Sequence, residues 1–198
     1  MSYSQNGIRE RIRLYLINHD RNEKLLNDVP HRTFLDLAVV YRLLTIDGKS
    51  EDAEEITHLK MEELGMNEEE LYQAAMENME SDVRILSFGN KDNGSSAIYI
   101  VPSIACLTNS EKYKGSGIML SKNTLSAFAE HFESNVLILP SSMHELMVVM
   151  DTGDDEQVDY LKLTVRGVNS DPRLLSKEDY LSDNVYRFNR QTQEITIA

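Results

Sequence analysis

Residues 140–145 bring three side chains that could carry out acyl or group transfer into one short stretch. The segment reads Pro-Ser-Ser-Met-His-Glu and directly follows an apolar run. A hydroxyl, an imidazole and a carboxylate are the groups that serve as nucleophile, base and orienting acid. A hydrolase or transferase would therefore use Ser142 as nucleophile, His144 as base and Glu145 as the acid that orients it.

The same residues also suit a turn after a strand, and this second interpretation is the one we favour from sequence. Triad partners usually come from distant parts of the chain, and no Gly-x-Ser-x-Gly elbow exposes a serine here. Pro140 would end the strand, Ser141 or Ser142 would cap the turn, and His144 would bond nearby backbone. On this interpretation the segment is a structural corner.

Cys106 is the only cysteine, so an internal disulfide is excluded. A thiolate pair of Cys106 with His144, oriented by Asn109, is a further alternative. However, Cys106 lies in an apolar, strand-like run, where an inert buried thiol is the usual case.

Metal and cofactor sites are not predicted. The fourth residue after His144 is Val148, so the spacing of a zinc protease is absent, and His19, His31, His58 and His131 are scattered along the chain. The stretch 115–117 reads Gly-Ser-Gly and lacks the continuation of a phosphate-binding loop.

Negative charge is the strongest compositional feature and it is local. The chain has 198 residues and a formal net charge of −13, and residues 51–82 alone contain 12 acidic residues against Lys60. Such a balance argues against direct nucleic-acid binding, which needs clustered Lys and Arg. No apolar run reaches the length of a membrane span and the N-terminus does not read as a signal peptide, so we expect a cytoplasmic protein with no membrane contact.

The acidic segment 51–82 is predicted to form a helical hairpin with helices at 53–64 and 67–79, separated by Gly65. Asn67 and Glu70 resemble a capping box, and acids in the first turn of a helix are stabilised by its dipole. The remaining carboxylates could form a surface for a basic protein partner. The residues expected to bind that partner are Glu54, Glu55, Glu62, Glu63, Glu68 and Glu69.

Local patterns elsewhere predict a single α+β domain over 1–198, with a mixed, largely antiparallel sheet, packed helices and the acidic hairpin. Further helices are expected at 8–17 and 22–26, after Ser121, and along Val158, Leu161, Val165 and Val168. Residues 33–46 read as a long strand or a buried helix, with strand preferred, and 89–96 read as a polar loop. Short strands are expected at 83–88, 97–101, 104–108, 117–120, 136–139, 146–150, 185–188 and 194–197.

The last two of these strands should pair as a terminal hairpin. Tyr180, Asp183, Tyr186, Arg187 and Arg190 could line a groove there, but aromatic residues on one face of a hairpin are more simply core.

Residues 138–145, which read Ile-Leu-Pro-Ser-Ser-Met-His-Glu, and several further stretches resemble a family known as domain of unknown function 5688, found in gut Firmicutes. Its members usually carry an additional N-terminal region, a proline-containing stretch in place of 80–88 and an aromatic residue in place of Leu137. Because no activity is assigned to the family, the resemblance implies kinship without a function. The matching stretches are 35–40, 58–61, 69–72, 107–109, 138–145, 168–169 and 181–188, and 138–145 is the most specific.

Two functions from different classes follow from the sequence. The first is a non-enzymatic binding or regulatory protein whose acidic hairpin contacts a basic partner, in the manner of small acidic mimics of nucleic acid made by phages and mobile elements. The second is a hydrolase or transferase that uses residues 140–145. A purely architectural subunit is a third alternative.

Overall fold

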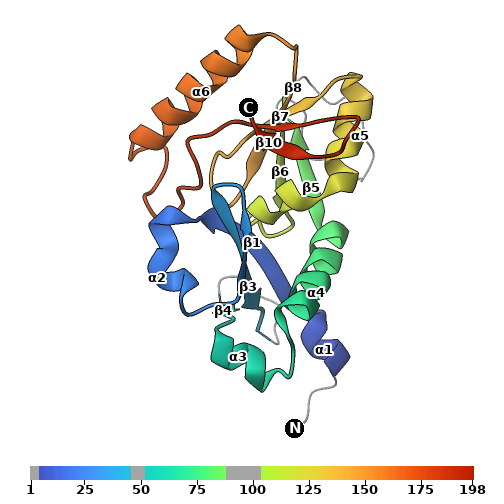
Figure 1. Ribbon diagram of the computed structural model, residues 1–198, viewed down its shortest axis with the longest axis vertical. Coiled ribbons are helices and arrows are strands. Elements are labelled where there is room, and N and C mark those ends of the chain that lie inside the picture. The colour runs from blue at the N-terminus through green and yellow to red at the C-terminus, as the bar shows by residue number, and fades with distance from the viewer. Residues whose placement is uncertain (1–4, 46–51, 88–103) are drawn as a thin grey trace.

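The computed structural model describes residues 5–45, 52–87 and 104–198 (Figure 1). Six α-helices and two antiparallel sheets are described, which confirms the predicted α+β class. The helices are α1 Gln5–Arg9, α2 Glu23–Leu26, α3 His58–Glu63, α4 Glu68–Ser81, α5 Lys122–Phe132 and α6 Asp155–Ser170, with 3-10 turns η1 Asp20–Asn22 and η2 Ser116–Leu120.

The first sheet has the order β1-β3-β2, and β4 pairs with β3. Its strands are β1 Ile12–Asn18, β2 His31–Phe34, β3 Leu37–Leu43 and β4 Glu54–Glu55. Every residue of β3 is buried, because its two faces belong to two different hydrophobic clusters. The preferred interpretation of 33–46 as strand is confirmed, but a turn at Leu35 and Asp36 divides it, and Leu35 adopts a left-handed φ of 57°.

The helix predicted at 8–17 is wrong, because most of that segment is β1. Ile12, Leu14 and Leu16 face the main core, whereas Tyr15 and Ile17 belong to a second cluster on the other face. A strand that is buried on both faces reads as a nearly continuous apolar run, and the spacing of Ile8, Ile12 and Leu16 then imitates a helix. The short turn at 22–26 is confirmed as α2.

The second sheet has the order β10-β9-β7-β8-β6-β5 and is antiparallel throughout. It confirms the strands predicted from 83, 104, 136, 146, 185 and 194 onwards, including the terminal hairpin. Its strands are β5 Val83–Ser87, β6 Ile104–Asn109, β7 Val136–Leu139, β8 Leu146–Met150, β9 Tyr186–Phe188 and β10 Ile195–Ile197. The loop predicted at 89–96 and the strand at 97–101 lie outside the described residues.

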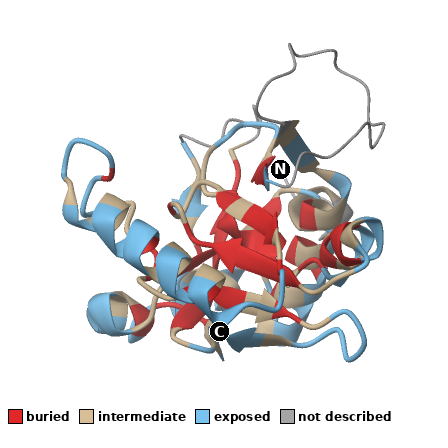
Figure 2. Cartoon of the chain, turned by 90° about the horizontal axis from the view of Figure 1, so that it is seen from above, coloured by how far each residue is buried: buried red, intermediate tan, exposed pale blue. Residues whose placement is uncertain are grey.

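Helices cover the second sheet on both faces (Figure 1). The main core joins Val136, Ile138 and Val148 of this sheet to β1, β3, α4 and α5. On the opposite face, Leu137 and Val149 pack against α6. The main core therefore lies at the centre of the molecule (Figure 2), and two smaller clusters lie on the other faces of the sheets.

The strand predicted at 117–120 is wrong, since this stretch forms the 3-10 turn η2. It packs so closely on β1 that a Cβ atom on Gly117 would lie 2.3 Å from Cδ1 of Leu14. A short buried apolar run cannot distinguish a strand from a helical turn. By contrast, α5 begins as predicted after Ser121, whose hydroxyl accepts a hydrogen bond from the Thr124 amide.

The acidic segment forms the two predicted helices, α3 and α4, with one change at its start. Residues 54 and 55 form β4, and α3 begins at His58 after the N-cap Thr57, so the first helix is shorter than predicted. The second helix, α4, opens with the predicted capping box between Asn67 and Glu70. No helix in the described part of the chain is long and apolar enough to span a membrane.

Gly115 gives a direct test of the packing between η2 and the second sheet. A Cβ atom there would lie 2.6 Å from the backbone oxygen of His144, which cannot move easily. We expect Gly115→Ala to lower the free energy of unfolding by about 1–3 kcal/mol, as overpacking does. Urea denaturation measures the change.

The matched control is Gly167→Ala in α6, where an added Cβ meets nothing within 4 Å. Since alanine is the better helix former, this variant should be as stable as the wild type or up to about 1 kcal/mol more stable. Equal stability of the two variants would contradict the close packing at Gly115.

Candidate functional site

Residues 140–145 form the corner between β7 and β8, and both serines bond to backbone. The hydroxyl of Ser142 accepts a hydrogen bond from the His144 amide at 3.0 Å. The Ser141 hydroxyl donates to the carbonyl of Glu145 at 3.2 Å. These are the local bonds expected of a serine-capped turn.

The ring of His144 is held by two groups from other parts of the chain. Its Nδ1 accepts a hydrogen bond from the Lys114 amide at 3.0 Å, and its Nε2 lies 2.9 Å from Oδ1 of Asp179. Because Nδ1 is the acceptor, Nε2 carries the hydrogen and donates a hydrogen bond to Asp179. The ring also stacks on Tyr113, with 5.1 Å between centroids.

These contacts do not assemble a nucleophile and a base. Within the described residues, no hydroxyl or thiol forms a hydrogen bond with the His144 ring, so the geometry favours the structural interpretation of Ser142 and His144. The enzymatic alternative stays a prediction that no contact supports. The backbone of the corner also has a clear structural partner, since the His144 carbonyl accepts from the Gly115 amide and from the Thr108 hydroxyl.

Cys106 bonds to Glu145 rather than to His144. Its sulfur lies 3.3 Å from Oε2 of Glu145. Burial first, and then the neighbouring carboxylate, raises the pKa of the Cys106 thiol to about 12, which leaves it protonated and unreactive at neutral pH. Asn109 does not meet either residue through its side chain, which instead bonds both ways to the backbone of Tyr113.

The other histidines stay apart. His19 lies beside Asp20, His31 bonds the carbonyl of Val29, and His131 packs edge-on against Phe132. No group of three or more His, Cys, Asp or Glu side chains in the described chain is placed to hold a metal ion.

In the terminal hairpin, Tyr186 and Phe188 are completely buried, which confirms their prediction as core.

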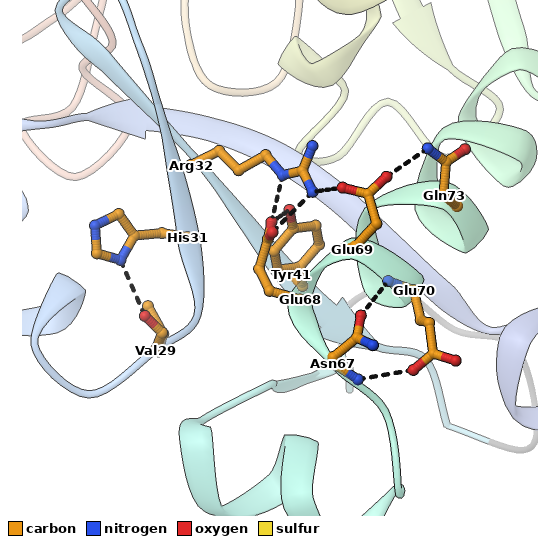
Figure 3. Close-up of polar contacts among 9 residues, drawn as sticks. All are labelled: Val29, His31, Arg32, Tyr41, Asn67, Glu68, Glu69, Glu70 and Gln73. Carbon is orange, nitrogen blue, oxygen red and sulfur yellow. Dashed lines mark hydrogen bonds and ion pairs between the residues drawn. The ribbon is translucent and has the colours of Figure 1, made fainter.

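Two of the six carboxylates predicted to bind a partner are engaged inside the molecule. At the start of α4, Glu68 accepts hydrogen bonds from Arg32 at 2.6 and 2.8 Å and from the hydroxyl of Tyr41 (Figure 3). This contact fixes α4 to β2 and β3. The burial of Tyr41, and after it the Glu68 carboxylate, raises the pKa of the tyrosine.

Glu55 is the second internal carboxylate. Its Oε1 lies 2.6 Å from Nζ of Lys114 and accepts a hydrogen bond from the Tyr15 hydroxyl at 2.7 Å. Lys114 also donates to that hydroxyl at 3.0 Å. The cluster joins β1 and β4 of the first sheet to the loop that precedes η2.

The other four predicted carboxylates face outwards. The exposed fraction of the side chain is 62% for Glu54, 58% for Glu63 and 60% for Glu69, and Glu62 is also exposed. Lys60 lies 3.2 Å from Glu54 and 3.7 Å from Glu63, and Arg32 also reaches Glu69. We call Glu54, Glu62, Glu63 and Glu69 the outer acidic face.

The family assignment rests on the chain as a whole. The model of a family of unknown function, DUF5688, matches residues 2–190 and so covers both the corner and the acidic hairpin. The chain belongs to the DUF5688 family. No curated protein and no solved structure matches it.

Three residues that organise this DUF5688 chain were missed by sequence reasoning. Lys114 and Asp179 hold the ring of His144, and Asp36 accepts hydrogen bonds from Ser182, Asn184 and Tyr186. The last contact joins the β2–β3 turn to the segment before β9. Asp36 lies in the stretch 35–40 and its bonding partners lie in 181–188, and both stretches resemble the family. This resemblance was the sequence signal that could have pointed to a contact between them.

The division into internal and outer carboxylates predicts different effects of the same substitution. Glu68→Gln should lower the free energy of unfolding by about 1–3 kcal/mol, because it removes the charge that Arg32 and Tyr41 bond. Glu62→Gln should change it by less than about 0.5 kcal/mol, as an exposed surface change does. Urea denaturation of both variants tests this, and a Glu68→Gln protein as stable as the wild type would contradict the internal role.

Proposed function

We propose that the protein is a non-enzymatic binding or regulatory protein that uses the outer acidic face to contact a basic protein partner. The observation that carries the proposal is the exposure of the four carboxylates of the outer acidic face, and Leu59, on α3, is also 66% accessible. One turn further along the helix lie Glu62 and Glu63. The carboxylates give this surface a negative potential that would attract a basic partner.

The chemistry of the partner follows from this arrangement. Interfaces are commonly anchored by an apolar side chain near the centre, while charged residues at the rim steer association and exclude wrong partners. Leu59 would enter an apolar pocket, and Lys or Arg residues around that pocket would face Glu54, Glu62, Glu63 and Glu69. A basic cleft that normally holds nucleic acid has this pattern of charge, so mimicry of nucleic acid is a specific form of the proposal.

The proposal also accounts for the charge that the fold does not use. Glu55 and Glu68 bond residues of other elements, whereas among the described residues the outer carboxylates form ion pairs only with Lys60 and Arg32, and Glu69 also accepts a hydrogen bond from Gln73. Exposed ion pairs of this kind add little stability, about 0–1 kcal/mol. A partner that displaces those ion pairs would therefore lower the stability of the fold only slightly.

The test is affinity capture from the native host followed by mass spectrometry, with two variants that remove the same charge. Glu54, Glu62, Glu63 and Glu69 are changed to Gln in the first variant. Glu130, Glu133, Glu178 and Glu194, which are exposed and lie elsewhere, are changed to Gln in the control.

We expect the wild type and the control to capture the same basic protein, and the first variant to lose it at least tenfold. Adding Leu59→Ala to the wild type should also weaken capture, and competition by duplex DNA would identify a nucleic-acid-binding partner. Equal capture by all forms, or a captured partner without a basic surface, would contradict the proposal.

A further inference from the structure

Helix α6 has two apolar sides, and only one of them is covered. Val158 and Val165 face the second sheet and are buried. On the opposite side, Tyr160 and Leu163 are 69% and 68% exposed. Figure 1 shows α6 along the outside of the molecule, at the end away from α3, and Figure 2 shows its outward side as exposed.

The exposed side continues with Gly167, one heptad after Tyr160. A Cβ atom on Gly167 would meet nothing within 4 Å, so no packing inside this chain requires the glycine. Glycine is disfavoured in the interior of a helix. An absent side chain at this position does, however, leave room for a bulky group that approaches from outside.

Charge along the exposed side changes sign from one end of the helix to the other. Asp155, Glu156 and Asp159 are exposed in the N-terminal half, and Arg166 is exposed in the C-terminal half. Asp159 and Arg166 are seven residues apart and therefore lie on the same flank of the apolar stripe. An antiparallel copy of the same helix would present the opposite sign at each end.

We propose that α6 pairs with α6 of a second copy of this chain, antiparallel, about a twofold axis at Leu163. In this arrangement Leu163 of one copy meets Leu163 of the other. Tyr160 of each copy covers Gly167 of the other, and Asp159 of each lies beside Arg166 of the other. A twofold interface requires a surface that complements itself. Here Tyr160 and Gly167 complement each other in shape, and Asp159 and Arg166 complement each other in charge.

The size of the contact and the net charge both indicate a weak dimer. A helix of 16 residues is about 24 Å long, which gives an interface at the low end of the range for specific complexes. Each copy carries a net charge of −13, but the acidic hairpin lies at the far end of the molecule from α6 (Figure 1). Because charges more than about 8 Å apart are largely screened at physiological salt, repulsion between the hairpins does not prevent the pairing.

Sedimentation velocity of the full chain tests the proposal over concentrations from about 1 to about 200 µM, which span a weak dimer. We expect the wild type to shift from monomer to dimer with rising concentration. Asp159→Arg alone and Arg166→Asp alone should each weaken dimerisation at least tenfold, because like charges then face each other twice. Circular dichroism verifies that each variant keeps its fold.

Charge exchange makes the test specific to this geometry. An equimolar mixture of the two single variants should form a heterodimer, and the double variant Asp159→Arg/Arg166→Asp should dimerise like the wild type. Gly167→Ala should weaken the dimer without lowering the stability of the monomer. A wild type that stays monomeric throughout would overturn the proposal, as would a dimer that is insensitive to the single charge changes.

Discussion

The ion pair between Lys114 and Glu55 is a polar contact that links the two sheets, in addition to the hydrophobic core that they share. Glu55 lies on β4 of the first sheet, and Lys114 lies in the loop that leads from the second sheet into η2. The backbone amide of Lys114 is fixed by His144, whose ring is in turn fixed by Asp179. The corner at 140–145 is therefore connected to this ion pair through the amide of Lys114.

The acidic segment therefore contains two kinds of carboxylate. Glu55 and Glu68 lie in the acidic segment, but each bonds a cation and a tyrosine hydroxyl within the fold. Their carboxylates replace the hydration that burial removes from Lys114 and Arg32. The exposed carboxylates Glu54, Glu62, Glu63 and Glu69 form a separate group, which we propose contacts the partner together with Leu59.

Local patterns were sufficient for the helix caps and for short apolar runs bounded by turn-forming residues, even in β7, which is buried on both faces. The caps at Ser121 and Asn67 and the strands β7 and β8 follow from short-range chemistry and were predicted from sequence. The strand β1 was not, because it lacks the alternation that identifies a strand and the spacing of Ile8, Ile12 and Leu16 imitates a helix. The contact of Arg32 with Glu68 spans 36 residues and that of His144 with Asp179 spans 35, and no local pattern contains them.

A double-mutant cycle with Glu55→Gln and Lys114→Met measures the central contact directly. If the ion pair joins the sheets as described, urea denaturation of the two single variants and the double variant should give a coupling energy of about 1–3 kcal/mol, the range for residues in contact. A coupling energy below about 0.3 kcal/mol would contradict the account, because the two side chains would then contribute to stability independently.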